Sequence, residues 1–340
     1  MPQQPRRSRF PALAVAAVLL SACIQDSPLD SLDPQGPFAQ TIDNLFWVTF
    51  WIATGIFVLV QGGILLAVFL FREKPDSKEP RQIHGNTRLE VAWTVIPALI
   101  LAGIAVPTVR TVFDLTECGA GAMPIEVIGH QWWFEYRYPE SGVISANVLV
   151  IPAGQEVCLT MTSNDVIHNY WIPKLNGKRY LVPGEETLLR LQADEPGEYW
   201  GQCGEFCGLS HAMMRARVNA LAPAEFEAWT AAQLEPALEP EEGSPAARGK
   251  EVFLGQACIG CHNISDVNPL DTATVEIYGP DLTHFASRNV FAGATLDNTP
   301  ENVAVWLANP PAVKPGSYMP NLGLSQSDID DLIAYLESLR

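Results

Sequence analysis

The sequence predicts a multi-domain membrane protein, in which a two-helix transmembrane hairpin is followed by an all-β sandwich and then by an all-α domain. Three observations predict this fold class. Two long apolar runs lie near the N-terminus, short alternating runs between Gly and Pro turns fill the middle, and helical periodicity returns at the end. A length of 340 residues suffices for several domains. The net charge of −17 argues against nucleic acid as a partner.

The first 22 residues carry three arginines and then an apolar run that is too short to span a bilayer, which is typical of a secretory signal peptide. The run ends in Leu20-Ser-Ala-Cys23, the small-residue pattern that precedes a lipid-modified cysteine in bacterial lipoproteins. We therefore expect a mature chain that begins at Cys23 with a lipid anchor. An unmodified cysteine after a simple signal is the alternative. Loss of the three arginines changes the net charge to −20.

Residues 23–113 predict the transmembrane hairpin, with spans at about 42–71 and 89–113. Both runs are long enough to cross a bilayer, whereas core helices of a soluble protein are usually shorter. Residues 72–88, between the spans, hold five basic residues, so the positive-inside rule places this loop in the cytoplasm. We expect a multi-pass protein of the bacterial cytoplasmic membrane, with its N-terminus and its two later domains on the outer, periplasmic side.

Residues 114–232 predict the all-β domain, a sandwich or a barrel, because short runs with alternating polarity are separated by Gly and Pro turns. The runs that we expect to be strands include Trp132–Tyr138, Val148–Ile151, Val157–Thr162, Leu188–Leu191 and Arg215–Val218. The strand-like stretch from Val157 continues to His168. A Pro-rich, acidic stretch at 233–243 is typical of a linker. Residues 244–340 then form the last domain.

One cluster of soft ligands carries most of the chemistry. His168 is followed at a distance by Cys203, Cys207, His211 and Met214, in the pattern H-x34-C-x3-C-x3-H-x2-M. Thiolates, imidazoles and a thioether together suit copper, and a mononuclear blue-copper site needs only one Cys. The second Cys therefore predicts two thiolates that bridge two coppers, with a backbone oxygen, most simply that of Glu205, completing the set. A disulfide is the alternative for Cys-x3-Cys in an exported protein, but the His and Met offsets favour copper.

The stretch from about residue 41 to 229 resembles subunit II of haem–copper cytochrome c oxidases. The likeness is dense in three segments, Gly129-His-Gln-Trp132-Trp-Phe, Asn164-Asp165-Val-Ile-His168 and Gly201 to Met214. It implies a cupredoxin fold, a binuclear CuA centre with the ligands just named, and a magnesium ion that the Glu205 side chain shares with subunit I. It also places Trp132 where electrons reach the copper; a buried core aromatic is the alternative.

Two further positions have two interpretations each. In Glu90-Val-Ala-Trp93 the resemblance implies that Glu90 stands at a proton intake of subunit I, whereas an acid in a first helical turn is also favoured by the helix dipole. Cys118 and Cys158 are either a disulfide, as an oxidising compartment allows, or buried free thiols.

Cys258-Ile-Gly-Cys261-His262 is a haem c attachment motif, in which both thiols bind the haem and the His binds its iron. A thioredoxin-type redox pair is disfavoured, because the preceding residues 246–257 predict a helix and not a strand. By elimination Met319, in a Pro-rich loop, is the sixth ligand, with His284 as the other candidate. Residues 244–340 thus resemble a class I cytochrome c domain.

Within that domain, Ser325 and Asp328 predict a capping box at the start of the terminal helix. The resemblance implies that Pro280, in Gly279-Pro280, orients His262 through its carbonyl; an ordinary turn is the alternative.

We expect this chain to be the electron-input subunit of a terminal oxidase of the haem-c-bearing, caa3-like kind. A donor cytochrome c or a quinol-oxidising complex supplies electrons, which pass by haem c and CuA to haem in subunit I. There oxygen is reduced to water, coupled to proton translocation, so oxygen chemistry belongs to the complex and not to this chain. The alternatives are the CuA subunit of a nitric oxide reductase and a copper-insertion metallochaperone with a thioredoxin-like fold.

Overall fold

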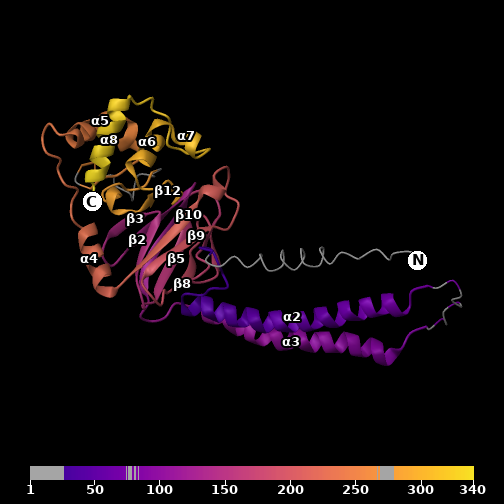
Figure 1. Cartoon of the computed structure of the whole chain (residues 1–340). Coiled ribbons are helices and arrows are strands. Elements are labelled where there is room, and N and C mark those ends of the chain that lie inside the picture. Colours follow the sequence, from indigo (N-terminus) through magenta and orange to yellow (C-terminus); the bar gives the residue numbers. More distant parts are fainter. Residues whose placement is uncertain are drawn as a thin grey trace, which may run out of the picture.

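The computed structural model describes residues 27–73, 75, 79, 82, 84–265, 267–268 and 279–340. The predicted signal peptide, Cys23 and three of the basic residues between the spans lie outside the described residues. Figure 1 shows three parts in the order that the sequence predicts: a long helical hairpin, a β-sandwich and a helical C-terminal domain. The C-terminal domain lies across the sandwich from the hairpin.

The hairpin consists of α2 (Pro37–Leu70) and α3 (Thr87–Thr116), both somewhat longer than the predicted spans. Most apolar side chains along them are exposed, as expected for helices that lie in lipid. Asn86 caps α3 by accepting hydrogen bonds from backbone N–H groups of the first turn. The carboxylate of Glu90 accepts in return from the N–H of Asn86 at 3.2 Å. Glu90 therefore acts at a helix N-terminus, and its proton role stays a prediction.

Two five-stranded sheets form the sandwich, in the orders β3-β2-β1-β5-β8 and β4-β10-β9-β6-β7. The pairs β1–β5 and β4–β10 are parallel and the other pairs are antiparallel. Apolar side chains from both sheets fill the core around Tyr136 and Tyr170, whose hydroxyls lie 3.2 Å apart. The strands are β1 Met123–His130, β2 Trp133–Tyr138, β3 Val143–Ala146, β4 Val148–Pro152, β5 Val157–Ser163, β6 His168–Trp171, β7 Lys178–Leu181, β8 Thr187–Leu191, β9 Gly197–Cys203 and β10 Arg215–Leu221.

Two expectations about the strands are wrong in detail, and both concern the site. The run Val157–Thr162 lies in β5 as predicted, but the strand-like stretch does not continue to His168: β5 ends at Ser163 in one sheet, and β6 begins at His168 in the other. Trp132 was expected within a strand, but it lies in the two-residue turn between β1 and β2. The chain changes sheets between Ser163 and His168, which brings His168 beside β9.

The base of the sandwich is tied to the hairpin. A disulfide joins Cys118, just after α3, to Cys158 on β5, so the first of the two interpretations of this pair is confirmed. Arg190 on β8 donates to the Glu156 carboxylate at 2.8 Å and to the Asp114 carbonyl at 2.5 Å, near the end of α3. These contacts fix where the sandwich stands on the membrane helices.

The C-terminal domain is built on helices α5 (Pro245–Gly255), α6 (Pro300–Ala308), α7 (Pro310–Val313) and α8 (Gln326–Ser338). Before them, α4 (Pro223–Gln233) packs on β4 and β10, and residues 234–244 have neither helix nor strand. The predicted capping box at Ser325 is present. One short ribbon, β11 (Val290–Phe291) with β12 (Leu296–Asp297), departs from the all-α prediction, and its turn meets the sandwich.

Candidate metal and haem sites

The candidate copper ligands converge because neighbouring strands present them. The strand β9 ends at Cys203 and β10 begins at Arg215, so the ligand-bearing loop joins two paired strands, as the sequence predicts. His168 begins β6, which pairs with β9. Gly129 on β1 lets the His168 ring pack against the backbone, since a Cβ there would lie 2.8 Å from Cδ2 of the ring. The sheets thus position His168 and Cys203, and the loop between β9 and β10 carries Cys207, His211 and Met214.

The donor atoms lie at metal-binding distances from one another. The two sulfurs of Cys203 and Cys207 are 3.8 Å apart, far beyond the length of about 2.05 Å of a disulfide bond. Cys203 lies 4.0 Å from Nδ1 of His168, and Cys207 lies 3.6 Å from Nδ1 of His211. Met214 places its sulfur 3.9 Å from Cys207. Donors bound at about 2.0–2.3 Å to a shared tetrahedral metal are separated by such distances.

The two thiols influence each other's ionisation. The Cys207 thiol, helped by the His168 ring, lowers the pKa of Cys203 to about 3. The Cys203 thiolate in turn raises the pKa of Cys207 far above its usual range. Two buried sulfurs this close therefore need a cation before both can be thiolates, and a bound metal supplies that charge. The donor set fits copper, which prefers thiolate, imidazole and thioether ligands.

Asp165 belongs to this site, although the sequence predicts no role for it. Its carboxylate pairs with Nε2 of His168 at 2.7 Å and accepts from the N–H of Gln131 at 2.6 Å. Burial alone would lower the pKa of His168, but Asp165 and Cys203 outweigh burial and raise it. A carboxylate on the far nitrogen of a metal-binding histidine fixes which nitrogen faces the metal. The one sequence feature that could have indicated this role is the spacing, because Asp165 lies three residues before His168.

The other predicted positions divide between this site and the hairpin. The backbone oxygen of Glu205 lies 3.3 Å from the Cys203 sulfur, so it belongs to the donor cluster, while its side chain is half-buried. Glu90 stands in the first turn of α3, at the end of the hairpin away from the sandwich.

Trp132 contacts the loop Cys203–Met214 directly, and we refer to this loop as the copper loop. Its indole N–H donates to the carbonyl of Cys207 at 2.9 Å, and the Gln131 side chain donates to the same oxygen at 2.7 Å. The side chain is only 6% exposed. Trp132 is thus a buried aromatic, as one interpretation expects, and it contacts a candidate copper ligand; its role in electron entry stays a prediction.

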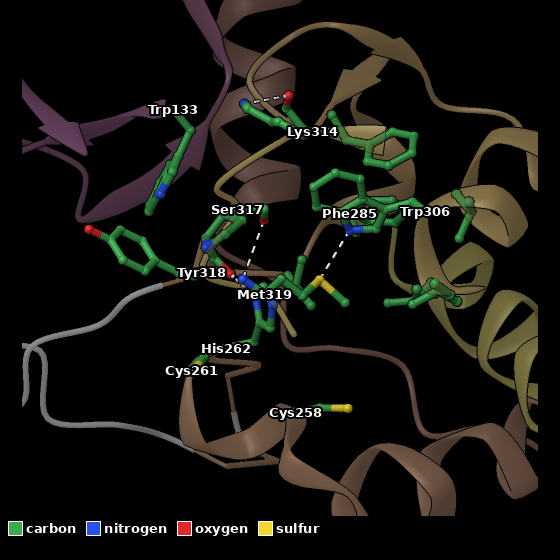
Figure 2. A pocket seen from close by; sticks show the side chains of 18 of the residues that line it. Trp133, Cys258, Cys261, His262, Phe285, Trp306, Lys314, Ser317, Tyr318 and Met319 are labelled. Carbon is green, nitrogen blue, oxygen red and sulfur yellow. Dashed lines mark hydrogen bonds between the residues drawn. The ribbon is translucent and has the colours of Figure 1, made fainter. Parts of the chain in front are cut away.

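A cavity holds the haem motif. Cys258, Cys261, His262 and Met319 all line it, and Figure 2 shows His262 and Met319 pointing into the same space. Nδ1–H of His262 donates to the Pro280 carbonyl at 2.8 Å, which confirms the expected orientation and leaves Nε2 for a metal. Burial lowers the pKa of His262, which favours the neutral ring that metals bind.

Met319 is the better placed of the two candidates for the sixth ligand. Its sulfur accepts from the indole N–H of Trp306 at 3.1 Å, on the wall of the cavity (Figure 2). His284 instead pairs its Nδ1 with the carbonyl of Arg340 at 2.8 Å, and it is absent from the lining formed by the described residues.

The charge of the cavity also fits a haem. Arg288 lines the cavity and is buried, and two of its guanidinium nitrogens have no hydrogen-bond partner in the part of the chain that the structure describes. Burial lowers its pKa to about 10, although Asp281 lies near. A buried cation without a partner is costly, and haem propionates are anions that can satisfy it. Free thiols at Cys258 and Cys261 complete the fit.

Comparison with known families accounts for most of the chain. The family described as "Cytochrome C oxidase subunit II, transmembrane domain" matches residues 29–111. "Cytochrome C oxidase subunit II, periplasmic domain" matches residues 143–221, and "Cytochrome c" matches residues 246–340. Each match falls on one of the three parts of the fold.

Relatives extend this likeness over the full length. "Cytochrome c oxidase subunit 2" of Alkalihalophilus pseudofirmus is 36% identical, with 98% of this chain and 97% of that protein covered. The protein of the same name from Bacillus sp. strain PS3 is 32% identical, with 97% of both chains covered. "Quinol oxidase subunit 2" of Bacillus cereus is 32% identical over 74% of this chain and 88% of its own length. The chain is therefore a membrane-anchored member of the cytochrome c oxidase subunit II family, with a fused cytochrome c domain, and it binds copper and haem c as part of a haem–copper oxidase.

Proposed function

We propose that this chain passes electrons to haem in subunit I through haem c and a binuclear CuA centre. The observation that carries the proposal is that each of the two close sulfurs has its own imidazole, as two bridged metals require. When bound, haem c and copper supply one-electron carriers, and oxygen reduction coupled to proton translocation takes place outside this chain. The proposed copper ligands are His168, Cys203, Cys207, His211, Met214 and the carbonyl of Glu205.

The residues of the chain hold both sites rigid. Asp165 and β6 fix the ring of His168, and β9 fixes Cys203, so the donor set changes little between redox states. We propose His262 and Met319 as axial haem ligands and Cys258 and Cys261 as the attachment thiols; Met/His ligation raises the potential of a haem.

Partners and location complete the proposal. The Glu205 side chain would hold a magnesium ion shared with subunit I, and Glu90 would stand at a proton intake of that subunit. The sandwich and the haem domain would lie on the outer, periplasmic side, with a lipid on Cys23. The donor would be a cytochrome c or a quinol-oxidising complex. The support for this orientation is the cluster of basic residues between α2 and α3.

The test is metal analysis and electron spin resonance on the purified soluble part of the chain. We expect this part to bind two coppers and to show a mixed-valence signal shared by two copper nuclei. Met214→Leu should shift the copper potential while both coppers stay bound, because a weak axial ligand tunes the potential more than the affinity. A single-copper, blue-type signal from the wild-type protein would refute the binuclear centre.

The alternatives fare less well. A copper-insertion metallochaperone would have a thioredoxin-like fold. The β-sandwich contradicts this hypothesis. The family relatives are named as oxidases, which favours oxygen over nitric oxide as the electron acceptor of the complex. Comparing turnover of the purified complex with oxygen and with nitric oxide separates these two acceptors.

A further inference from the structure

A six-residue segment, Lys314–Met319, connects the two sites, and we refer to it as the Met319 loop. Its first residue is a lysine only 4% exposed, which is rare unless the charge is paired. Nζ of Lys314 donates to the carbonyl of Trp132 at 2.6 Å and to the carbonyl of Ala292 at 2.8 Å. One amine therefore joins the backbone of the sandwich to that of the haem domain. Burial lowers its pKa to about 7, but both of its protonation states carry hydrogens for these two bonds.

The far end of the loop reaches the same tryptophan. The ring of Tyr318 stacks on that of Trp132, with centroids 6.2 Å apart and planes 11° apart. Its hydroxyl donates to Oε1 of Gln131 at 2.8 Å. Gly316 lies against the indole, since a Cβ there would come within 2.8 Å of the ring. Figure 2 shows Tyr318 and Met319, neighbours in the chain, among the residues that line the haem cavity.

Contacts outside the loop close the junction. Ser210, in the copper loop, donates to the Pro315 carbonyl at 2.5 Å. The turn of the ribbon adds two bonds: Gly293 N–H donates to the Asn147 side chain at 3.0 Å, and Arg215 N–H donates to the Gly293 carbonyl at 2.9 Å. Polar groups of both domains thus find partners across the junction, which indicates a specific docked arrangement.

We propose that Tyr318 is the contact through which the haem domain delivers electrons to Trp132, and that Lys314 is the positioning residue that holds this contact in place. The inference rests on the proposed function. The chain of contacts is short: Met319 is bonded to Tyr318, Tyr318 stacks on Trp132, and Trp132 donates to the carbonyl of Cys207. One electron leaves reduced haem c, which is oxidised, and reduces the copper centre; no proton moves and Tyr318 itself is not oxidised.

This arrangement also determines the order in which electrons from an external donor reach the two sites. Because the Met319 loop covers Trp132, a free donor protein has no access to that residue, and it has to reduce haem c first. Tyr318 itself is 58% exposed, so its truncation leaves the core of the haem domain intact.

The experiment uses the intact oxidase, with haem c reduced by a light-activated dye and copper reduction followed by absorbance. Tyr318→Leu and Lys314→Met should each slow the haem c-to-copper step by about tenfold or more, through loss of the ring contact or of a charge-assisted bond. Tyr318→Phe keeps the ring and should stay within about twofold of wild type. The potentials and spectra of both centres, and the onward step from copper, should not change.

The matched controls are Tyr180→Leu and Lys250→Met. Tyr180 is an exposed tyrosine on β7, and Lys250 pairs with the exposed Glu239. Both should transfer at the wild-type rate. A wild-type rate in Tyr318→Leu, with normal spectra, would overturn the inference. If haem c never reduces copper in the wild-type oxidase, the proposed function fails instead.

Discussion

Asp165 illustrates how a residue that touches no metal can control one. Its carboxylate holds Nε2 of His168, so Nδ1 faces the Cys203 sulfur. The same carboxylate accepts from the backbone of Gln131, next to Trp132. One side chain therefore orients a candidate ligand and the turn that carries the tryptophan.

We expect Asp165→Asn to weaken copper binding by about 10- to 100-fold, as is typical when the partner of a ligating histidine is lost. The amide can present its NH₂ to Nε2, which favours the wrong tautomer. Competition with a copper chelator measures the affinity. Asp194→Asn is the control, because Asp194 is exposed on the same domain. Equal affinity in wild type and Asp165→Asn would show that the carboxylate does not orient the ring.

For single residues, the sequence predicts the candidate metal ligands far better than it predicts which other side chains contact them. Cys203, Cys207, His211 and Met214 fall within twelve residues, so their spacing alone indicates a metal. Lys314 and Trp132 lie 182 residues apart, and no local pattern relates them. Contacts that depend on how two domains dock are decided by the packing of whole surfaces, so they become visible only in the fold.

Among the elements, α5 and α8 cross so closely that the contact has no room for a side chain at Gly249. Gly249 on α5 lies against α8 so closely that a Cβ would come within 2.0 Å of the Asp331 carbonyl oxygen. Both helices contribute to the core of the haem domain through residues such as Phe253 and Tyr335.

Gly249→Ala should therefore destabilise the haem domain by about 1–3 kcal/mol, the usual cost of overpacking a core contact. Thermal unfolding followed by haem absorbance measures the effect. Gly255→Ala, at the end of the same helix, is the matched control, since a Cβ there meets nothing within 4 Å. A melting temperature for Gly249→Ala equal to that of Gly255→Ala would mean that the helices can separate without loss.

The ion pair at the base of the sandwich predicts a pH dependence. Arg190 donates to Glu156 and lowers the pKa of that carboxyl. The pair thus stabilises the fold above the ordinary pKa of a glutamate, and this contribution is lost as pH falls through the lowered value. Glu156→Gln should cost about 1 kcal/mol or less at neutral pH, because the pair is partly exposed, and nothing in strong acid. Thermal unfolding of the detergent-solubilised chain at neutral pH and in acid measures this difference in stability. Glu140→Gln, at an exposed position, is the control. A loss of stability in Glu156→Gln that persists in acid would contradict the prediction.

Element prediction succeeds where patterns are long and fails where they are short. The two membrane helices and the terminal helix α8 have runs or repeats long enough to be distinctive. Strands β6 and β7 have four residues each, and β7 (Lys-Arg-Tyr-Leu) is mostly polar, so hydrophobic alternation could not reveal them. The pairing of β6 with β9, which brings His168 to Cys203, depends on contacts between segments far apart in the chain.

For the whole molecule, the tether between the domains determines how electron transfer responds to salt. Residues 244–340 hold 11 acidic and 5 basic residues, so a soluble donor that is steered by charge should present a basic face. The haem domain needs no such steering toward copper, since it is already docked and tethered.

We expect the haem c-to-copper rate to be nearly independent of ionic strength and of protein concentration, while the donor-to-haem rate falls with salt. Flash reduction of haem c at low and high salt, with copper absorbance as the readout, measures the first rate. Mixing with a soluble reduced donor measures the second. A copper reduction rate that drops steeply with salt, or that scales with protein concentration, would mean that the haem domain of the same chain is not the donor.

The haem cavity has walls from both domains, and this constrains how the protein matures. Trp132, Trp133 and Asn147 of the sandwich line the same cavity as Cys258 and Cys261. An attachment enzyme has to reach both thiols and the edge of the haem, and the sandwich covers one side of that space once the domains have met. The segment 234–244, which has neither helix nor strand, is the connection that would let the haem domain stay apart until then. Haem loading would therefore come before docking, so the contact between the two domains would form only on a domain that already holds its haem.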